Sequence, residues 1–517
     1  MQFLEKKITK NFLKLIIFSP LLIYLGERSS IAHDEGFYIL QAKWILEKGN
    51  WIAPMWWGNI SLDRTITIQY LLATFRRFFG ESGFVTYLPI TIGSALMLFV
   101  TYQLHKELVD KKLPLFSSLI LSTTYLWINY SHMATQDIIF SSFIVIGIYS
   151  SIRSSRNKEN IHFFISGSWI GLAFMLKTYL TFIPLIAITP FLIINRQIFN
   201  KYFWLGTLLG FVPFLVWSYQ IISNYGIESY SGVYNKLISL SKNNTFTNPI
   251  YYYLWNLPIN TFPWCIFSIF GFIQAYNSKS KLSKYFLFKY PLIVLLLISL
   301  FSTKTPYYPI QLLPLISINT YLGIIYLLNK KNKLIYHFRN FIFLFIPSLL
   351  LIFFIYINTN LNIDFIDDDN RKIISISLLI FSASWIFVPF SKNFIKQLIL
   401  ILIGPYILFS TLVQTGILTD RAKDLRIACQ VLINNENLQN KKVKVISNEI
   451  NSETEKKIIQ ISLLMPQVVE GFARLENVDS NSYAWTTLDN IDIKKNIQFE
   501  VINESPIFSP WKLVEKK

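Results

Sequence analysis

Apolar residues in this 517-residue chain come in long blocks, and these blocks restrict the fold more than any other feature. Runs such as 84–104, 202–222, 341–357 and 395–412 approach the ~20 residues that a helix needs to cross ~30 Å of hydrocarbon. The runs do not alternate with period 2, and lipid offers no partner for free backbone groups, so helices are the expected spanning structure. Thirteen spans are predicted, near residues 11–26, 84–104, 113–129, 137–152, 162–178, 179–195, 202–222, 254–276, 285–301, 306–328, 336–357, 371–390 and 395–416.

Basic residues predict the orientation of these spans. With a cytoplasmic N-terminus, every second loop is rich in Lys and Arg, as the positive-inside rule requires. Those loops hold Lys106, Lys111 and Lys112, Arg153, Arg156 and Lys158, Arg196 and Lys201, Lys279, Lys281 and Lys284, Lys330, Lys331 and Lys333, and Lys392 and Lys396. They account for most of the net charge of +18, so we expect membrane lipids as neighbours and no nucleic-acid partner.

An odd number of spans places three hydrophilic segments outside: 27–83, 223–253 and the tail from about 417. The tail predicts a small α/β domain, with helices at 424–434 and 453–464 and strands at 442–447 and 498–503. We therefore predict an all-α polytopic membrane domain over residues 1–416 and a small soluble α/β domain over 417–517.

Carboxylates near the membrane are candidates for function, because ionisable groups at that depth are costly. Asp34 and Glu35 follow the first predicted helix, and Asp137 stands where the fourth begins. Asp34 and Asp137 also suit helix N-caps, which is the alternative interpretation of each. Since Asp34, Asp63 and Asp137 all fall on the external side, folding could bring them together.

Cations on the same side suggest what these carboxylates surround. Arg64 adjoins Asp63, and Lys177 and Lys304 lie at helix ends in short outside turns. Each cation could simply extend its side chain to the membrane–water interface. Three cations near three carboxylates nevertheless suggest a site for an anionic group that approaches from the membrane.

Several motifs in order resemble a known family. They are Asp34-Glu35-Gly36-Phe37-Tyr38, the segments 49–54 and 58–70, Asp137, Lys177 in a Leu-Lys-Thr context, Tyr251-Tyr252-Tyr253-Leu254 with Phe262-Pro263-Trp264, and Lys304-Thr305-Pro306-Tyr307-Tyr308 with Pro314. Together they resemble membrane glycosyltransferases of the GT-C type, family 39, the group of lipid A aminoarabinose transferases and dolichyl-phosphate-mannose protein mannosyltransferases. Asp63-Arg64 stands where that family carries a Glu-Lys pair.

The resemblance implies the GT-C fold and a bacterial inner-membrane enzyme that transfers a sugar from a polyprenyl-phosphate donor to a lipid, glycan or protein hydroxyl on the external face. It implies inversion at the anomeric carbon with Asp34 as general base, and with Glu35 and Asp137 orienting substrate or supporting Asp34. Arg64, Lys177 and Lys304 would bind the lipid phosphate, and Asp63, Tyr307 and Tyr308 the substrate. No metal ligand is assigned, and a divalent cation stays an open possibility.

Two other classes of protein remain. A transporter or lipid flippase would also be polytopic, but it is expected to show internal repeats and helices broken at mid-membrane depth. A noncatalytic membrane scaffold has no need of converging external charges. The position of the ionisable residues at one face favours the transferase over both.

Overall fold

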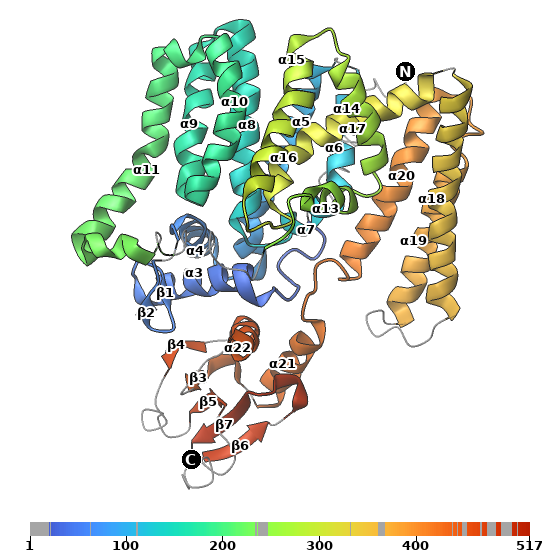
Figure 1. Cartoon of the computed structure of the whole chain (residues 1–517). Helices are drawn as coiled ribbons and strands as arrows, with labels where there is room; N and C mark the ends of the chain where they lie inside the picture. Colours follow the sequence, from blue (N-terminus) through green and yellow to red (C-terminus); the bar gives the residue numbers. More distant parts are fainter. Residues whose placement is uncertain are drawn as a thin grey trace.

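The computed structural model describes a helical bundle with a small sheet domain at one end (Figure 1). The residues described are 20, 22–62, 64–109, 112–232, 235, 247–330, 332–359, 368–436, 438–441, 443–446, 452–465, 468–472, 482–487, 499–503 and 505–516. The predicted helix at 11–26 falls mostly outside them.

The helical bundle contains most of the chain. Its elements are α5 (Gly83–Leu108), α6 (Pro114–Ser122), α7 (Tyr125–Ser131), α8 (Gln136–Asn157), α9 (Asn160–Lys177), η2 (Thr178–Thr181), α10 (Phe182–Ile194), η3 (Gln197–Phe199), α11 (Lys201–Tyr225), η4 (Ile227–Tyr230), α13 (Tyr252–Asn260), α14 (Cys265–Tyr276), α15 (Lys281–Lys284), η6 (Tyr285–Lys289), α16 (Tyr290–Leu300), η7 (Tyr308–Leu312), α17 (Leu313–Asn329), α18 (Lys333–Thr359), α19 (Asp368–Ile386) and α20 (Phe394–Gln414).

Eight helices in the described residues are long and apolar enough to span a membrane: Gly83–Leu108, Gln136–Asn157, Asn160–Ile194, Lys201–Tyr225, Lys281–Leu300, Tyr308–Asn329, Lys333–Thr359 and Phe394–Gln414. The pair α13 and α14, bent by 115°, makes a ninth if it counts as one broken span. The bend is expected where Pro263 offers no N–H to continue the helix. The polytopic helical fold is confirmed, whereas thirteen as the number of spans stays a prediction.

One predicted span has a different form in the structure. Residues 113–129 form two short helices, α6 and α7, with a break at Thr123 and Thr124. The hydroxyls of these two threonines donate to carbonyl oxygens one turn earlier, and Trp264 donates its indole N–H to the Thr123 carbonyl oxygen at 3.2 Å. A continuous apolar run therefore does not become one helix, because side chains satisfy the backbone groups at the break.

Small residues let α9 and α11 approach closely. A Cβ added at Gly171 would lie 2.2 Å from the backbone of Gly210, and one added at Gly206 would lie 2.0 Å from the carbonyl oxygen of Phe164. Close backbone contact through small residues is the usual way in which helices associate in lipid.

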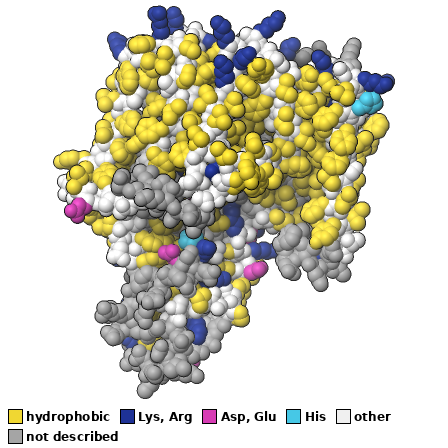
Figure 2. Space-filling view, in the orientation of Figure 1, with side chains coloured by type: hydrophobic (Ala, Val, Ile, Leu, Met, Phe, Trp, Pro, Cys, Tyr) yellow, Lys and Arg dark blue, Asp and Glu magenta, His cyan; other side chains and the backbone are white. Residues whose placement is uncertain are grey.

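The surface divides into an apolar band and a basic end. Figure 2 shows apolar side chains over the visible face of the bundle and Lys and Arg gathered at the end farthest from the sheet domain. This pattern agrees with the predicted orientation, which itself stays a prediction.

The first loop forms its own layer between the bundle and the sheet domain (Figure 1). It consists of η1 (Ala32–Gly36), α3 (Phe37–Lys48), the hairpin β1 (Met55–Trp56) and β2 (Asn59–Ile60), and α4 (Thr67–Phe79).

The C-terminal domain is the predicted small α/β unit. It contains α21 (Lys423–Asn435), η8 (Leu438–Asn440), β3 (Val443–Ile446), α22 (Ser452–Leu464), β4 (Val468–Phe472), β5 (Tyr483–Thr486), β6 (Phe499–Asn503), η10 (Pro506–Phe508) and β7 (Lys512–Lys516). The sheet order is β4-β3-β5-β7-β6, parallel from β4 to β5 and antiparallel from there on.

A buried carboxylate, Asp420, joins the C-terminal domain to the first loop. Its side chain is 1% exposed and accepts hydrogen bonds from Ser29 N–H at 3.0 Å and from Arg426 Nη2 at 2.7 Å. Arg28 Nη1 lies 3.5 Å away. Burial would raise the pKa of Asp420, but the hydrogen bonds from Arg426 and Ser29 outweigh it and hold the pKa below its ordinary value.

We predict that Asp420→Asn lowers stability at pH 7 by about 3 kcal/mol or more, because the arginines lose a buried partner. Since the folded-state pKa is lowered, the stabilisation is fully present above the unfolded-state pKa of about 4 and is lost as the pH falls through the folded value. Thermal unfolding of the purified protein should therefore separate native chain and variant at pH 7 and bring them together toward pH 3. The exposed Asp424→Asn in α21 is the control. An equal difference at both pH values would contradict the assignment.

Candidate functional site

Asp34 has an uncommon backbone conformation. Its φ of 61° and ψ of −80° lie in the strained γ-turn region, which a residue other than glycine keeps only when its surroundings enforce it. The turn directs the side chain outward: the carboxylate is 52% exposed, and Oδ1 lies 3.9 Å from Arg64 Nη1. Asp34 is therefore an accessible carboxylate paired loosely with a cation.

Glu35, the next residue, has the opposite environment. It is fully buried; Oε1 accepts from the Tyr87 hydroxyl at 2.6 Å and from Ala134 N–H at 3.0 Å, and Oε2 accepts from Ile31 N–H at 3.0 Å. These bonds connect the turn to α5 and to the segment before α8. Glu35 thus supplies part of the restraint that the strained backbone at Asp34 requires.

Arg64 lies among aromatic rings. Its Nη1 donates to the Tyr38 hydroxyl at 2.8 Å, and its guanidinium lies 4.8 Å from the ring centroid of Phe37. Burial raises the pKa of Tyr38 to about 12, although Arg64 acts to lower it. The Tyr38 hydroxyl is therefore protonated at neutral pH and keeps a proton to donate.

Asp137 and Lys177 form a buried ion pair at the ends of two neighbouring helices. Asp137 lies in the first turn of α8, at the positive end of the helix dipole, and Lys177 lies in the last turn of α9, at the negative end. Each charge is stabilised by the dipole of its helix. Lys177 Nζ also lies 4.5 Å from the ring centroid of Tyr307.

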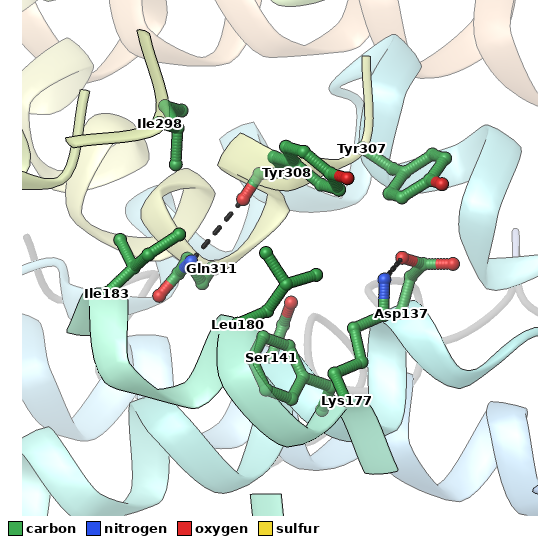
Figure 3. Close-up of a pocket in the computed structure, with 10 residues that line it drawn as sticks. Asp137, Ser141, Lys177, Leu180, Ile183, Ile298, Tyr307, Tyr308 and Gln311 are labelled. Atoms are coloured by element: carbon green, nitrogen blue, oxygen red, sulfur yellow. Dashed lines mark hydrogen bonds and ion pairs between the residues drawn. The ribbon is translucent and has the colours of Figure 1, made fainter. Parts of the chain in front are cut away.

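A small pocket surrounds this pair. Figure 3 shows the Lys177 amine directed at Asp137, with Tyr307 and Tyr308 nearby. The lining residues are Asp137, Phe140, Ser141, Lys177, Leu180, Ile183, Ile298, Tyr307, Tyr308 and Gln311. The pocket thus combines an ion pair with aromatic and apolar walls.

Backbone contacts join the Arg64 loop to the pocket. Thr65 donates its hydroxyl to the Leu176 carbonyl oxygen at 3.4 Å, and Thr67 donates to that of Met175. Arg64 is therefore held close to the end of α9, where Lys177 lies. Because Glu35 also binds Ala134, three residues before Asp137, both charged pairs belong to one region of the molecule.

Two predicted site residues differ from this arrangement or fall outside it. Lys304 Nζ donates to the carbonyl oxygens of Asn248 at 2.8 Å and Phe301 at 2.6 Å, and Lys304 is absent from the pocket lining. Phosphate binding by Lys304 stays a prediction, and its contacts favour a role in holding the loop before Tyr307. Asp63 lies outside the described residues.

The helix-cap interpretation of the two carboxylates is wrong. The N-cap of α8 is Thr135 and that of α3 is Gly36, and neither helix has a side-chain cap hydrogen bond. Asp137 nevertheless benefits from its position in the first turn.

Three further residues that take part in these contacts were not predicted from the sequence. Tyr38 binds Arg64, Tyr87 binds Glu35, and Gln311 lines the pocket. Of the three, only Tyr38 could have been identified from the sequence, since it belongs to the motif that begins at Asp34. Within the part of the chain that the structure describes, no three His, Cys, Asp or Glu side chains are grouped to hold a metal ion.

Residues 63–219 match the family model described as dolichyl-phosphate-mannose-protein mannosyltransferase. The chain is 23% identical over 334 residues to an uncharacterized protein of Aquifex aeolicus, covering 60% of this chain and 63% of that protein. It is 22% identical to undecaprenyl phosphate-alpha-4-amino-4-deoxy-L-arabinose arabinosyl transferase 2 of Pseudomonas fluorescens, covering 54% of this chain and 50% of that protein. The matches thus span less than two thirds of these curated relatives.

Solved structures show the same fold. ArnT from Cupriavidus metallidurans bound to undecaprenyl phosphate superposes with a TM-score of 0.76 at 11% identity, covering 98% of each chain. Arabinosyltransferase EmbB from Mycobacterium smegmatis has a TM-score of 0.51 at 10% identity, covering 80% of this chain and 41% of that one. The resemblance to the GT-C group of aminoarabinose transferases and protein mannosyltransferases is confirmed.

We predict that Lys177→Met destabilises the protein by about 3–5 kcal/mol, because it leaves the Asp137 carboxylate buried without a counterion. The double variant Asp137→Leu/Lys177→Met should recover most of that loss, since no unpaired charge remains. Thermal unfolding in detergent measures both. The exposed Lys201→Met, a matched control, should change stability by less than about 0.5 kcal/mol. A double variant as unstable as Lys177→Met alone would show that the ion pair is not the source of the effect.

Proposed function

We propose that this integral membrane protein of the GT-C fold transfers a sugar from a polyprenyl-phosphate donor to a hydroxyl group of a lipid, glycan or protein. The observation that carries the proposal is the half-exposed Asp34 carboxylate, held by a strained turn opposite Arg64 and beside the Asp137–Lys177 pocket. The Cupriavidus metallidurans structure bound to undecaprenyl phosphate supports the lipid class of the donor.

Asp34 serves as the general base. An acceptor hydroxyl attacks the anomeric carbon as its proton passes to the Asp34 carboxylate, a transfer that contributes about 10²–10⁴-fold in rate. A bond forms between the acceptor oxygen and the anomeric carbon, and the bond from that carbon to the phosphate oxygen breaks. Attack opposite the leaving group inverts the anomeric centre. Asp34 suits this role because it is the accessible one of the two neighbouring carboxylates.

Arg64 and Lys177 stabilise the leaving polyprenyl phosphate, whose negative charge grows as the glycosidic bond breaks. Arg64 is partly exposed and presents a planar donor fork, which matches phosphate geometry. Lys177 contacts Asp137, so an incoming phosphate would compete with that carboxylate for the amine.

The remaining predicted residues take supporting roles. Glu35 holds the turn of Asp34 through its three hydrogen bonds, and Asp137 orients Lys177 and the sugar. Tyr307 and Tyr308 form the aromatic wall on which a sugar ring packs. Asp63, which precedes Arg64 in the sequence, takes part in substrate binding.

The reaction takes place on the external face of a bacterial inner membrane. The N-terminus is cytoplasmic, the membrane domain covers residues 1–416, and residues 417–517 lie on the external side. The basic end of the bundle and the position of the sheet domain opposite it support this orientation.

Transfer of radiolabelled sugar from a panel of polyprenyl-phosphate donors tests the proposal in membranes with matched expression. We predict that Asp34→Asn lowers transfer at least about 100-fold, because the amide cannot accept the acceptor proton. Asp424→Asn, an exposed aspartate in the C-terminal domain, is the control and should leave transfer unchanged. Full transfer by Asp34→Asn would remove its role as base. If the native chain uses no donor but moves labelled lipid across vesicles, the protein is a flippase.

We predict that Arg64→Gln lowers kcat about 10²–10³-fold, because the leaving phosphate loses a fixed positive charge. Arg64→Lys should retain more activity, since it keeps the charge without the planar fork. Arg77→Gln, in α4 of the same loop and exposed, is the control. Steady-state kinetics with varied donor distinguish the variants, and equal activity of Arg64→Gln and Arg77→Gln would contradict the assignment.

A further inference from the structure

The C-terminal domain reaches the turn that carries Asp34. Helix α22 packs against η1 at Gly36, where an added Cβ would lie 2.7 Å from Ile459 Cγ2 and 3.0 Å from Leu463 Cδ1. An added Cβ would also lie 2.8 Å from the Ile31 carbonyl oxygen. Because Gly36 has ordinary helical dihedrals, it is this crowding by α22 and by Ile31, and not a need for backbone freedom, that accounts for the absence of a side chain.

The same helix also binds the hairpin of the first loop. Trp56 donates its indole N–H to Glu455 Oε1 at 3.0 Å. Leu40 and Trp44 of α3 are buried in one apolar cluster with Ile458 and Ile459 of α22. The first loop and the C-terminal domain therefore share a core, which is more than a surface contact.

We propose that α22 is a positioning element that holds the Asp34 turn, with Ile459 and Leu463 as its positioning residues. The turn is restrained on two sides: Glu35 is hydrogen-bonded to the bundle, and Gly36 packs against α22. A strained conformation persists only under such combined restraint, and loss of one side lets the backbone at Asp34 relax. The catalytic consequence rests on the proposed role of Asp34 as base.

The phosphate-binding cations have restraints other than α22. Lys177 lies in α9 itself and pairs with Asp137. Arg64 contacts Tyr38 and Asp34, but its loop is also bonded to the last turn of α9 through Thr65 and Thr67. Removing the α22 contact should therefore misplace the base and leave donor binding in place, which lowers kcat without raising KM for the donor.

Ile459→Ala in the full-length protein tests this inference, with Leu513→Ala as the matched control. Leu513 lies in β7 and is fully buried in the same cluster. Hydrogen exchange is measured for peptides containing Ile31, Gly36 and Phe37, whose amides are bonded within the turn. We expect exchange there to rise at least about tenfold in Ile459→Ala and to stay as in the native chain in Leu513→Ala. Leu463→Ala, which removes the Cδ1 that faces Gly36, should show a change in the same direction and serves if Ile459→Ala does not fold.

Kinetics with the active donor supply the second measurement. A kcat lowered about 10- to 100-fold at a donor KM within about twofold of native supports positioning by α22. Unchanged exchange at the turn, or equal exchange and equal kcat losses in Ile459→Ala and Leu513→Ala, overturns it. If the native chain transfers no sugar, the proposed function fails, and the exchange measurement still decides whether α22 holds the turn.

Discussion

The buried carboxylate of Glu35 is the interaction on which the site depends. A charge removed from water is costly unless hydrogen bonds replace its hydration, and here Tyr87, Ala134 and Ile31 do so. Because these donors come from α5, from the segment before α8 and from the start of the loop, one side chain brings three separate parts of the chain together. The outward turn of Asp34 and the position of Asp137 both follow from that junction.

Environment, and not residue type, separates the roles of the charged groups. Asp34 and Glu35 are neighbours of similar chemistry, yet the Asp34 side chain is half exposed whereas Glu35 is fully buried. The same division holds for the cations: Arg64 is partly exposed, whereas Lys304 donates to two carbonyl oxygens. A group that has satisfied its bonding inside the protein has little left for a substrate, so accessibility favours Asp34 and Arg64 over Glu35 and Lys304. Lys177 is buried against Asp137 and would have to exchange that partner for the phosphate.

Hydropathy and local periodicity predicted much of the fold, because lipid imposes its requirements residue by residue. Most apolar runs became helices, and the tail segments 424–434, 442–447, 453–464 and 498–503 correspond to α21, β3, α22 and β6. The features that were missed depend on distant partners. The break at Thr123 involves Trp264, and the Lys304 amine binds Asn248. The distant donors Tyr87 and Ala134 bind Glu35 and not Asp34. No local pattern encodes such contacts, which is why the sequence indicated these charged residues without predicting which of them are buried and which are exposed.

The domain boundary predicted from hydropathy does not reveal that the C-terminal domain packs against the first loop. A boundary near residue 416 separates apolar spans from a soluble tail, but one apolar cluster includes Trp44 and Trp57 of the first loop together with Cys429 and Trp485 of the tail. Asp420 adds a second connection through Ser29. The first loop is thus held between the bundle and the C-terminal domain. The strained backbone at Asp34 persists because the bundle and the C-terminal domain both restrain it. The position of the Asp34 carboxylate therefore depends on both of these parts of the chain.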